Sequence, residues 1–178
     1  MRVVSVSSRN GHGLGKIVQA EIEVVAGLGV ANDTHSGATV KHCSRVAKDP
    51  TQPNLRQVHL IHAELLVELE AMGFTVLPGE LGENILTSGV ELLRLPAGTL
   101  LNIGLNAVIE ITGLRNPCNQ INGHSAGLMN ALIEIAADSS IVRKAGIMGV
   151  VLATGKVCPG DAISINMPDK PRHELKPV

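Results

Sequence analysis

Short runs of β-forming residues, each ended by glycine or proline, constrain the fold of this chain more than any other feature. Nineteen glycines and nine prolines punctuate its 178 residues. Between them lie short segments rich in Val, Ile and Leu, at 3–6, 17–25, 57–61, 92–95, 100–103, 107–112, 149–153 and 162–166. Such segments are typical of β-strands joined by tight turns. We therefore predict a mainly β fold with few helices, built as a barrel or a strongly bent sheet.

Two segments show helical periodicity instead. Residues 62–72 place Leu65, Leu66 and Leu69 on one stripe, and Gly73 is suited to end that helix. Residues 127–136 are predicted as a second helix. Residues 27–53 are polar and glycine-rich without sustained periodicity, which predicts a long loop, and long ordered loops often carry function.

Length and composition favour one globular domain over residues 1–178. Apolar residues make up 44% of the chain and charged residues 17%, which excludes disorder of the whole chain. The net charge of −1 and the single aromatic residue, Phe74, argue against nucleic-acid binding, which relies on basic surfaces and stacking platforms. The tail at 168–178 carries three prolines and is expected to lie as an extended strap over the surface.

The apolar segments and the cysteines predict the cellular compartment of the protein. The longest nearly apolar stretch, 147–153, is too short to span a bilayer, and polar residues interrupt the N-terminal apolar run that a signal peptide would need. Three cysteines are an odd number without CxxC spacing, which fits reduced thiols better than a disulfide framework. We therefore expect a cytoplasmic protein that neither spans nor binds a membrane.

Two glycine-rich segments and the histidines do not match known ligand motifs. Residues 11–16 lack both the first glycine and the Ser or Thr of a phosphate-binding loop, and 27–32 lack the third glycine of a dinucleotide fingerprint. The seven histidines form no recognised zinc spacing, even where His59 and His62 straddle a strand–helix junction or His42 adjoins Cys43. We interpret the glycine-rich segments as turns.

Asp33 and His35 form the first candidate site. Side chains two positions apart in an extended segment point the same way, so Asp33 could orient His35, or both could face a ligand. The alternative is an Asx turn beside a solvated histidine.

Cys118 is the second candidate. It follows a confidently predicted strand within 113–119, where Pro117 stiffens the turn and Arg115 could stabilise a thiolate, the form of cysteine that attacks sulfur or binds metal. The alternative is an inert, buried thiol. Cys43 and Cys158 lack comparable surroundings.

The segment 79–84 is the third candidate. It combines two glycines, two carboxylates and the amide of Asn84, which can donate and accept hydrogen bonds at once and so suits the edge of a heterocycle. A solvent-exposed turn is the alternative interpretation.

Taken in order, these segments resemble the MOSC domain family, named for the C-terminal domain of molybdenum-cofactor sulfurase. The resemblance covers nearly the whole chain, and Asn32 departs from it where the family usually has glycine. The matching segments are Gly27 with 33–37, 56–61, 79–84, 95–98, 112–118, Gly155 with 160–161, and the ending at 171–178.

The resemblance implies a closed, bent β-barrel like the small barrel domain of pyruvate kinase, with a pocket around Cys118. In amidoxime-reducing members of the family the equivalent cysteine ligates molybdenum held by a pterin cofactor. The resemblance thus implies a molybdenum–pterin cofactor here, with Cys118 as the metal ligand and Arg56, Arg115 and Asn116 among the cofactor-binding residues.

Further roles follow from the same resemblance. Glu83 and Asn84 would read the pterin edge, while Asp33 and His35 would lie at the pocket wall and handle protons. The implied reaction is reduction of an N-hydroxylated small molecule, with electrons from a separate reductase, because the chain has no cysteine cluster for an iron–sulfur domain of its own.

Two alternatives remain open at the level of sequence. Cys118 could carry a persulfide received from a cysteine desulfurase and act in sulfur transfer. The protein could also bind the cofactor without turnover and pass it to a partner. The molybdenum and persulfide hypotheses share one physical requirement, an accessible thiolate at Cys118.

Overall fold

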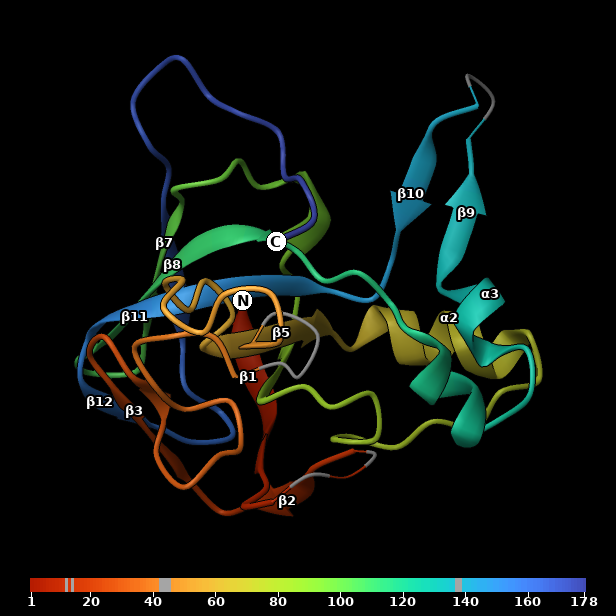
Figure 1. Ribbon diagram of the computed structural model, residues 1–178, viewed down its shortest axis with the longest axis horizontal. Helices are drawn as coiled ribbons and strands as arrows, with labels where there is room; N and C mark the ends of the chain where they lie inside the picture. The colour runs from red at the N-terminus through yellow and green to blue at the C-terminus, as the bar shows by residue number, and fades with distance from the viewer. Residues whose placement is uncertain (12, 14, 42–45, 137–138) are drawn as a thin grey trace.

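Strands dominate the structure and helices are few, as the sequence predicted (Figure 1). The computed structural model describes residues 1–11, 13, 15–41, 46–136 and 139–178. The strands are β1 (Arg2–Ser8), β2 (Ile17–Gln19), β3 (Ile22–Val25), β4 (Gly29–Val30), β5 (Val58–His62), β6 (Ile85–Ser88), β7 (Leu100–Ile103), β8 (Ala107–Leu114), β9 (Ile133–Ile135), β10 (Ile141–Arg143), β11 (Ile147–Ala153), β12 (Gly155–Val157) and β13 (Ile163–Asn166). The helices are α2 (Glu64–Ala71), α3 (Leu128–Ala131) and the 3₁₀ turns η1 (Leu92–Arg94) and η2 (Asn119–Gly123).

Within the described residues, the strands form one large sheet and two small ones. The large sheet has the order β13-β7-β8-β11-β5-β6-β1-β2, and β5 and β6 are parallel while its other pairs are antiparallel. The small sheets are β12-β3-β4 and β10-β9. Strand β8 explains the pattern well, because its alternating sequence AVIEITGL places every second side chain in the core.

The closed barrel implied by the family resemblance is not confirmed. No ladder among the described residues joins the end strands β13 and β2 of the large sheet. An isolated bridge between Arg2 and Ala162, with the Val3 N–H donating to the Asp161 carbonyl at 2.9 Å, brings β1 beside the start of β13. The end strand β13 therefore approaches β1, the neighbour of the other end strand, without a continuous ladder.

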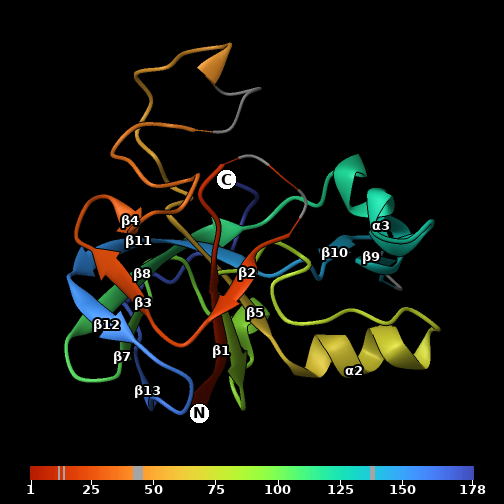
Figure 2. The same cartoon turned by 90° about the horizontal axis from the view of Figure 1, so that it is seen from below.

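Two apolar clusters hold these elements together. The larger is made of Val, Ile, Leu and Ala side chains from both the large sheet and β12-β3-β4. The second lies under α2, where Leu65 and Leu69 are buried and Leu66 is partly buried, as the predicted stripe requires. Figures 1 and 2 both place α2, α3 and the β9–β10 hairpin at one end of the molecule, away from β3 and β12.

The prediction of a second helix over 127–136 is largely wrong. Only Leu128–Ala131 is helical, and the chain then enters β9, which pairs with β10. The β-branched Ile133 and Ile135 flank Glu134 in an alternating pattern, and their pairing with Ile141–Arg143 outweighs the helical propensity of the preceding residues.

Two predicted strands also differ from the structure. Within the predicted strand 92–95, Leu92–Arg94 forms the 3₁₀ turn η1 and Leu95 follows it, because a spacing of three puts Leu92 and Leu95 on one buried side and leaves Arg94 exposed. Residues 17–25 divide into β2 and β3, because β2 pairs with β1 in the large sheet while β3 pairs with β12 and β4.

Where it is described, the predicted loop at 27–53 contains the short strand β4, an isolated bridge between Thr39 and Pro53 and one helical residue, Val46, and is otherwise turn and coil. His42 and Cys43 lie outside the described residues. Strand β11 ends at Ala153, and β12 begins two residues later at Gly155. No described helix is long and apolar enough to cross a membrane.

Candidate functional site

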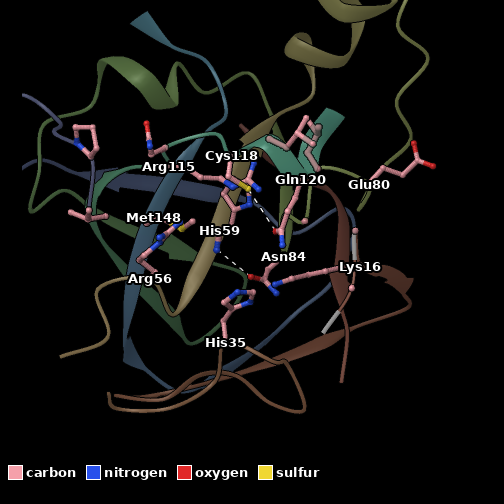
Figure 3. A pocket seen from close by; sticks show the side chains of 18 residues that line it. Lys16, His35, Arg56, His59, Glu80, Asn84, Arg115, Cys118, Gln120 and Met148 are labelled. Carbon is pink, nitrogen blue, oxygen red and sulfur yellow. Dashed lines mark hydrogen bonds between the residues drawn. The ribbon is translucent and has the colours of Figure 1, made fainter. Parts of the chain in front are cut away.

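A pocket of about 440 Å³ lies where β5, β8 and β11 meet the loops before β2 and β6, the loop after β4, and the tail. Figure 3 shows side chains from these segments converging on it. Cationic side chains are prominent in its lining, which contains Lys16, Arg56 and Arg115 and one carboxylate side chain, that of Glu80. The lining residues are Gly13, Gly15, Lys16, His35, Arg56, His59, Glu80, Leu81, Gly82, Asn84, Arg115, Asn116, Cys118, Gln120, Ile121, Met148, Pro177 and Val178.

Asp33 lies behind this wall and anchors two of its side chains. Its Oδ2 is 2.9 Å from the Lys16 Nζ, and both side chains are almost fully buried. Its Oδ1 accepts the His35 N–H at 3.0 Å and lies 3.4 Å from the His35 Nδ1. Thr34 and His35 lie in a turn and not in the extended segment that the sequence suggested, and in this turn Asp33 makes an Asx-type contact and also lies beside the His35 ring.

The pKa values of both members of the buried ion pair, Asp33 and Lys16, are shifted. Burial by itself would raise the pKa of Asp33, but the hydrogen bonds from His35 and the charge of Lys16 outweigh it and hold that pKa well below its ordinary value. Burial lowers the pKa of Lys16, and Asp33 opposes that shift. Asp33 is therefore a permanent anion at neutral pH.

The side-chain amide of Asn84 is hydrogen-bonded within the protein and does not offer a free edge to a ligand. Its Nδ2 donates to the Ser7 carbonyl and to the Asp33 Oδ2, both at 3.1 Å, and its Oδ1 accepts the His59 N–H at 3.1 Å. Both amide hydrogens are thus committed to the protein. Asn84 lines the pocket, but these bonds make it a residue that holds Asp33 and two strands in place.

Glu83 directly precedes Asn84 in the chain, and it is buried and does not line the pocket. Its Oε1 accepts the Gly79 N–H, and its Oε2 has no hydrogen-bond partner among the described residues. Burial raises the pKa of Glu83, although the bond from Gly79 and the charges of Arg115 and Lys16 oppose the shift.

Arg115 and Cys118 form the other side of the pocket, just after β8. The Arg115 N–H donates to the Gly146 carbonyl at 3.0 Å. The Arg115 Nη1 is buried and has no hydrogen-bond partner among the described residues. Cys118 is partly exposed, interacts electrostatically with Arg115, and has its Sγ 3.7 Å from the Gln120 Oε1. An unsatisfied buried guanidinium beside a thiol is what a bound anion would complete.

The remaining predicted residues also lie at the pocket. Arg56 lines it, and its backbone N–H donates to the Asn54 Oδ1 at 3.0 Å. Asn116 lines it too, and its Oδ1 accepts the Arg143 Nε at 2.9 Å. Predicted residues that lie more than 80 positions apart in the chain are thus brought to one cavity, with Asp33 and Glu83 behind it.

Lys16, His59 and Met148 are among the lining residues that sequence reasoning did not assign to the site. Lys16 ends the glycine-rich segment interpreted as a turn, and its charge between glycines and a strand was the available signal. His59 is buried in β5, with its Nε2 2.7 Å from the Ala145 carbonyl, and burial together with the charge of Arg115 holds its pKa well below the ordinary value. Met148 of β11 carried no signal beyond its apolar strand.

The sequence pattern of the MOSC domain family matches residues 37–164. The chain belongs to the MOSC domain family. Members of this family commonly bind a molybdenum cofactor. Among curated proteins, none matches the sequence significantly.

Solved structures share the fold of this MOSC protein. The YuaD protein of Bacillus subtilis is 20% identical with a TM-score of 0.78, over 94% of this chain and 96% of that one. YiiM of Escherichia coli is 19% identical with a TM-score of 0.61, over 97% of this chain and 73% of that one. YiiM of Geobacillus stearothermophilus is 16% identical with a TM-score of 0.64, over 97% and 77%.

The departure at Asn32 fits the MOSC fold. Its φ is 57°, in the left-handed region where glycine is favoured and asparagine is the best tolerated of the larger residues. The turn therefore keeps the backbone that presents Asp33 to Lys16, although the side chain differs from the usual glycine.

Proposed function

We propose that this MOSC protein binds a molybdenum–pterin cofactor, with Cys118 as the sulfur ligand that the protein supplies. The observation that carries the proposal is the buried, unpartnered Nη1 of Arg115 beside the partly exposed Cys118 in a cationic pocket. Thiolate sulfur is a ligand that molybdenum chemistry uses, and a guanidinium suits the oxygens of a phosphate or pterin.

The described residues fit such a group. A pocket of about 440 Å³ lies within the usual range for small-molecule and cofactor sites, about 300–1,000 Å³. Lys16, Arg56 and Arg115 supply positive charge for an anionic cofactor, and Asn116 adds an amide. Glu83, whose Oε2 has no described partner, lies close enough to act electrostatically on Arg115.

The residues of the chain divide the work in this proposal. Cys118 would hold the metal, while Lys16, Arg56 and Arg115 would hold the phosphate or pterin oxygens. When bound, the cofactor would supply a two-electron redox centre. His35 would carry a proton at the pocket wall, and its 44% exposed side chain and its contact with Asp33 support this role.

The reaction we propose is reduction of an N-hydroxylated compound to the corresponding amine or imine and water. It consumes two electrons and two protons. The electrons would come from a separate electron-transfer reductase, and His35 would deliver a proton to the leaving oxygen.

The test is the molybdenum and pterin content of protein produced in a molybdate-fed host. The wild type and Cys158→Ala should carry molybdenum and pterin in equal, near-stoichiometric amounts, because Cys158 lies outside the pocket lining. Cys118→Ala should lose most of its molybdenum because the metal loses its protein ligand. Unchanged molybdenum in Cys118→Ala would contradict the ligand assignment.

Sulfur transfer is the second candidate function. The partial exposure of Cys118 at the pocket favours it, because a persulfide carrier must meet a partner enzyme. It predicts that a cysteine desulfurase adds the mass of one sulfur to Cys118 in protein free of molybdenum. A cofactor carrier without turnover, in contrast, would bind molybdenum and pterin and remain inactive with every reductase.

A further inference from the structure

Residues 173–178, the last part of the 168–178 tail (the strap), are attached to the loop before β7 and to the end of β8. The His173 carbonyl accepts the Ala97 N–H at 2.9 Å. The Lys176 carbonyl accepts the Leu114 N–H at 2.9 Å, and the Val178 N–H donates to the Leu114 carbonyl at 3.3 Å. Leu114 and Pro177 form a parallel bridge. Figure 1 shows the C-terminus beside β8, where this bridge ties the strap to the large sheet.

Gly113 makes this close approach possible. A Cβ at Gly113 would lie 2.3 Å from the Lys176 carbonyl oxygen and 2.6 Å from the Val178 Cγ1. Its backbone is outside the left-handed region, so the strap, rather than conformation, is what excludes a side chain there. Met148 is the cross-strand partner of Gly113, and partners project from the same face of a sheet.

The strap thereby becomes part of the pocket. Pro177, Val178 and Met148 all line the cavity that contains Cys118, and together they provide an apolar wall next to its cationic side chains. The strap also holds both backbone polar groups of Leu114, and the next residue, Arg115, donates its N–H to Gly146. The backbone of Arg115 is therefore tied to the strap through the Leu114–Arg115 peptide.

We propose that the strap is a specificity-determining wall, which admits small or flat molecules to Cys118, excludes bulky ones, and positions Arg115. Its importance for a cofactor or substrate rests on the proposed function. Its effect on access to Cys118 does not, because a thiol reagent needs no cofactor. Failure of one hypothesis can therefore be distinguished from failure of the other.

The test measures alkylation of Cys118 as the only thiol, in a Cys43→Ser/Cys158→Ser background. Rate constants are compared for iodoacetamide and for a maleimide that carries a bulky polycyclic group. In Gly113→Ala, which displaces the strap, the ratio of bulky to small rate constants should rise by about tenfold or more. In Pro177→Ala/Val178→Ala, which trims the wall and keeps the backbone bonds, it should rise by about threefold.

Glu174→Ala is the matched control, because Glu174 belongs to the strap, is exposed and does not line the pocket. In Glu174→Ala, the ratio of bulky to small rate constants should equal that of the Cys43→Ser/Cys158→Ser parent. A merely structural role of the strap would lower stability or raise both rates together without changing the ratio. An unchanged ratio in Pro177→Ala/Val178→Ala would overturn the proposal, and this variant decides the question if Gly113→Ala does not fold.

Discussion

At the scale of single residues, the pocket depends on Asp33. This buried carboxylate pairs with the buried Lys16 ammonium at 2.9 Å and receives hydrogen bonds from Asn84 and His35. A buried ion pair adds little net stability compared with an apolar pair, but removal of one partner leaves the other charge without compensation. Asp33 therefore holds the groups that the pocket presents, and its loss should be costly.

Asp33→Asn should lower the free energy of unfolding by about 3 kcal/mol, because it leaves Lys16 buried and unpaired. Denaturant unfolding at pH 7 measures this loss. Lys16→Met/Asp33→Asn is the control and should recover at least about half of it, since no buried charge then remains. A loss below about 1 kcal/mol in Asp33→Asn, with no recovery in the double variant, would contradict this account.

The same variant has a predicted pH dependence. The folded-state pKa of Asp33 lies below its ordinary value, so its contribution to stability is fully present above that ordinary pKa of about 3.9 and is lost as the pH falls through the lower folded value. The stability difference between wild type and Asp33→Asn should therefore shrink below about pH 4. A difference that stays constant from neutral pH into this range would show that the charge of Asp33 is not the cause.

At this scale, the sequence could predict only contacts between residues that are close together in the chain. The spacing of Asp33 and His35 indicated that one could orient the other, and the structure shows that contact. Lys16 could not be assigned because its partner Asp33 is reached only when the hairpin of β1 and β2 and the loop after β4 fold together. The commitment of Asn84 to three internal partners likewise depends on distant strands.

At the scale of elements, Gln57 joins the small β12-β3-β4 sheet to the large one. Its Nε2 donates to the Gly27 carbonyl at 2.7 Å, and its Oε1 accepts the Val151 N–H of β11 at 3.0 Å. Gln57 is buried and directly precedes β5, which carries His59. This side chain therefore fixes the loop after β3 against the strands that form the floor of the pocket.

Gln57→Ala should lower the free energy of unfolding by about 2 kcal/mol, because it leaves the Gly27 carbonyl and the Val151 N–H without their partner. Amide hydrogen exchange at Val151 should accelerate in the same variant. Gln19→Ala is the control, since the Gln19 side chain bonds only the nearby Ile17 carbonyl among the described contacts. Equal losses in the two variants would show that Gln57 does not join the sheets.

The elements differ in how well the sequence predicted them. Strand β8 and helix α2 follow from strong local patterns, alternation in the first and an apolar stripe in the second. Residues 127–136 have a mixed pattern, and the pairing of Ile133–Ile135 with a strand that follows decides their conformation. Pairing partners are not visible in a local pattern, which is why this segment was misassigned.

At the scale of the whole molecule, the family resemblance supplied what local patterns could not. The match over 37–164 and the shared fold of YuaD and YiiM support a mainly β MOSC fold. The closed ladder expected from the resemblance is replaced by a bridge between Arg2 and Ala162. The position of the strap in the pocket was also out of reach, because only the folded sheet brings residues 173–178 to Gly113.

The central claim is that Cys118 ligates molybdenum in this pocket, and X-ray absorption at the molybdenum edge tests it most directly. Selenocysteine would replace Cys118 in the Cys43→Ser/Cys158→Ser background, and the protein would be loaded with molybdenum–pterin cofactor. We predict a selenium atom among the ligands of molybdenum, because the side chain at position 118 binds the metal. Stoichiometric molybdenum without a selenium neighbour would contradict the claim.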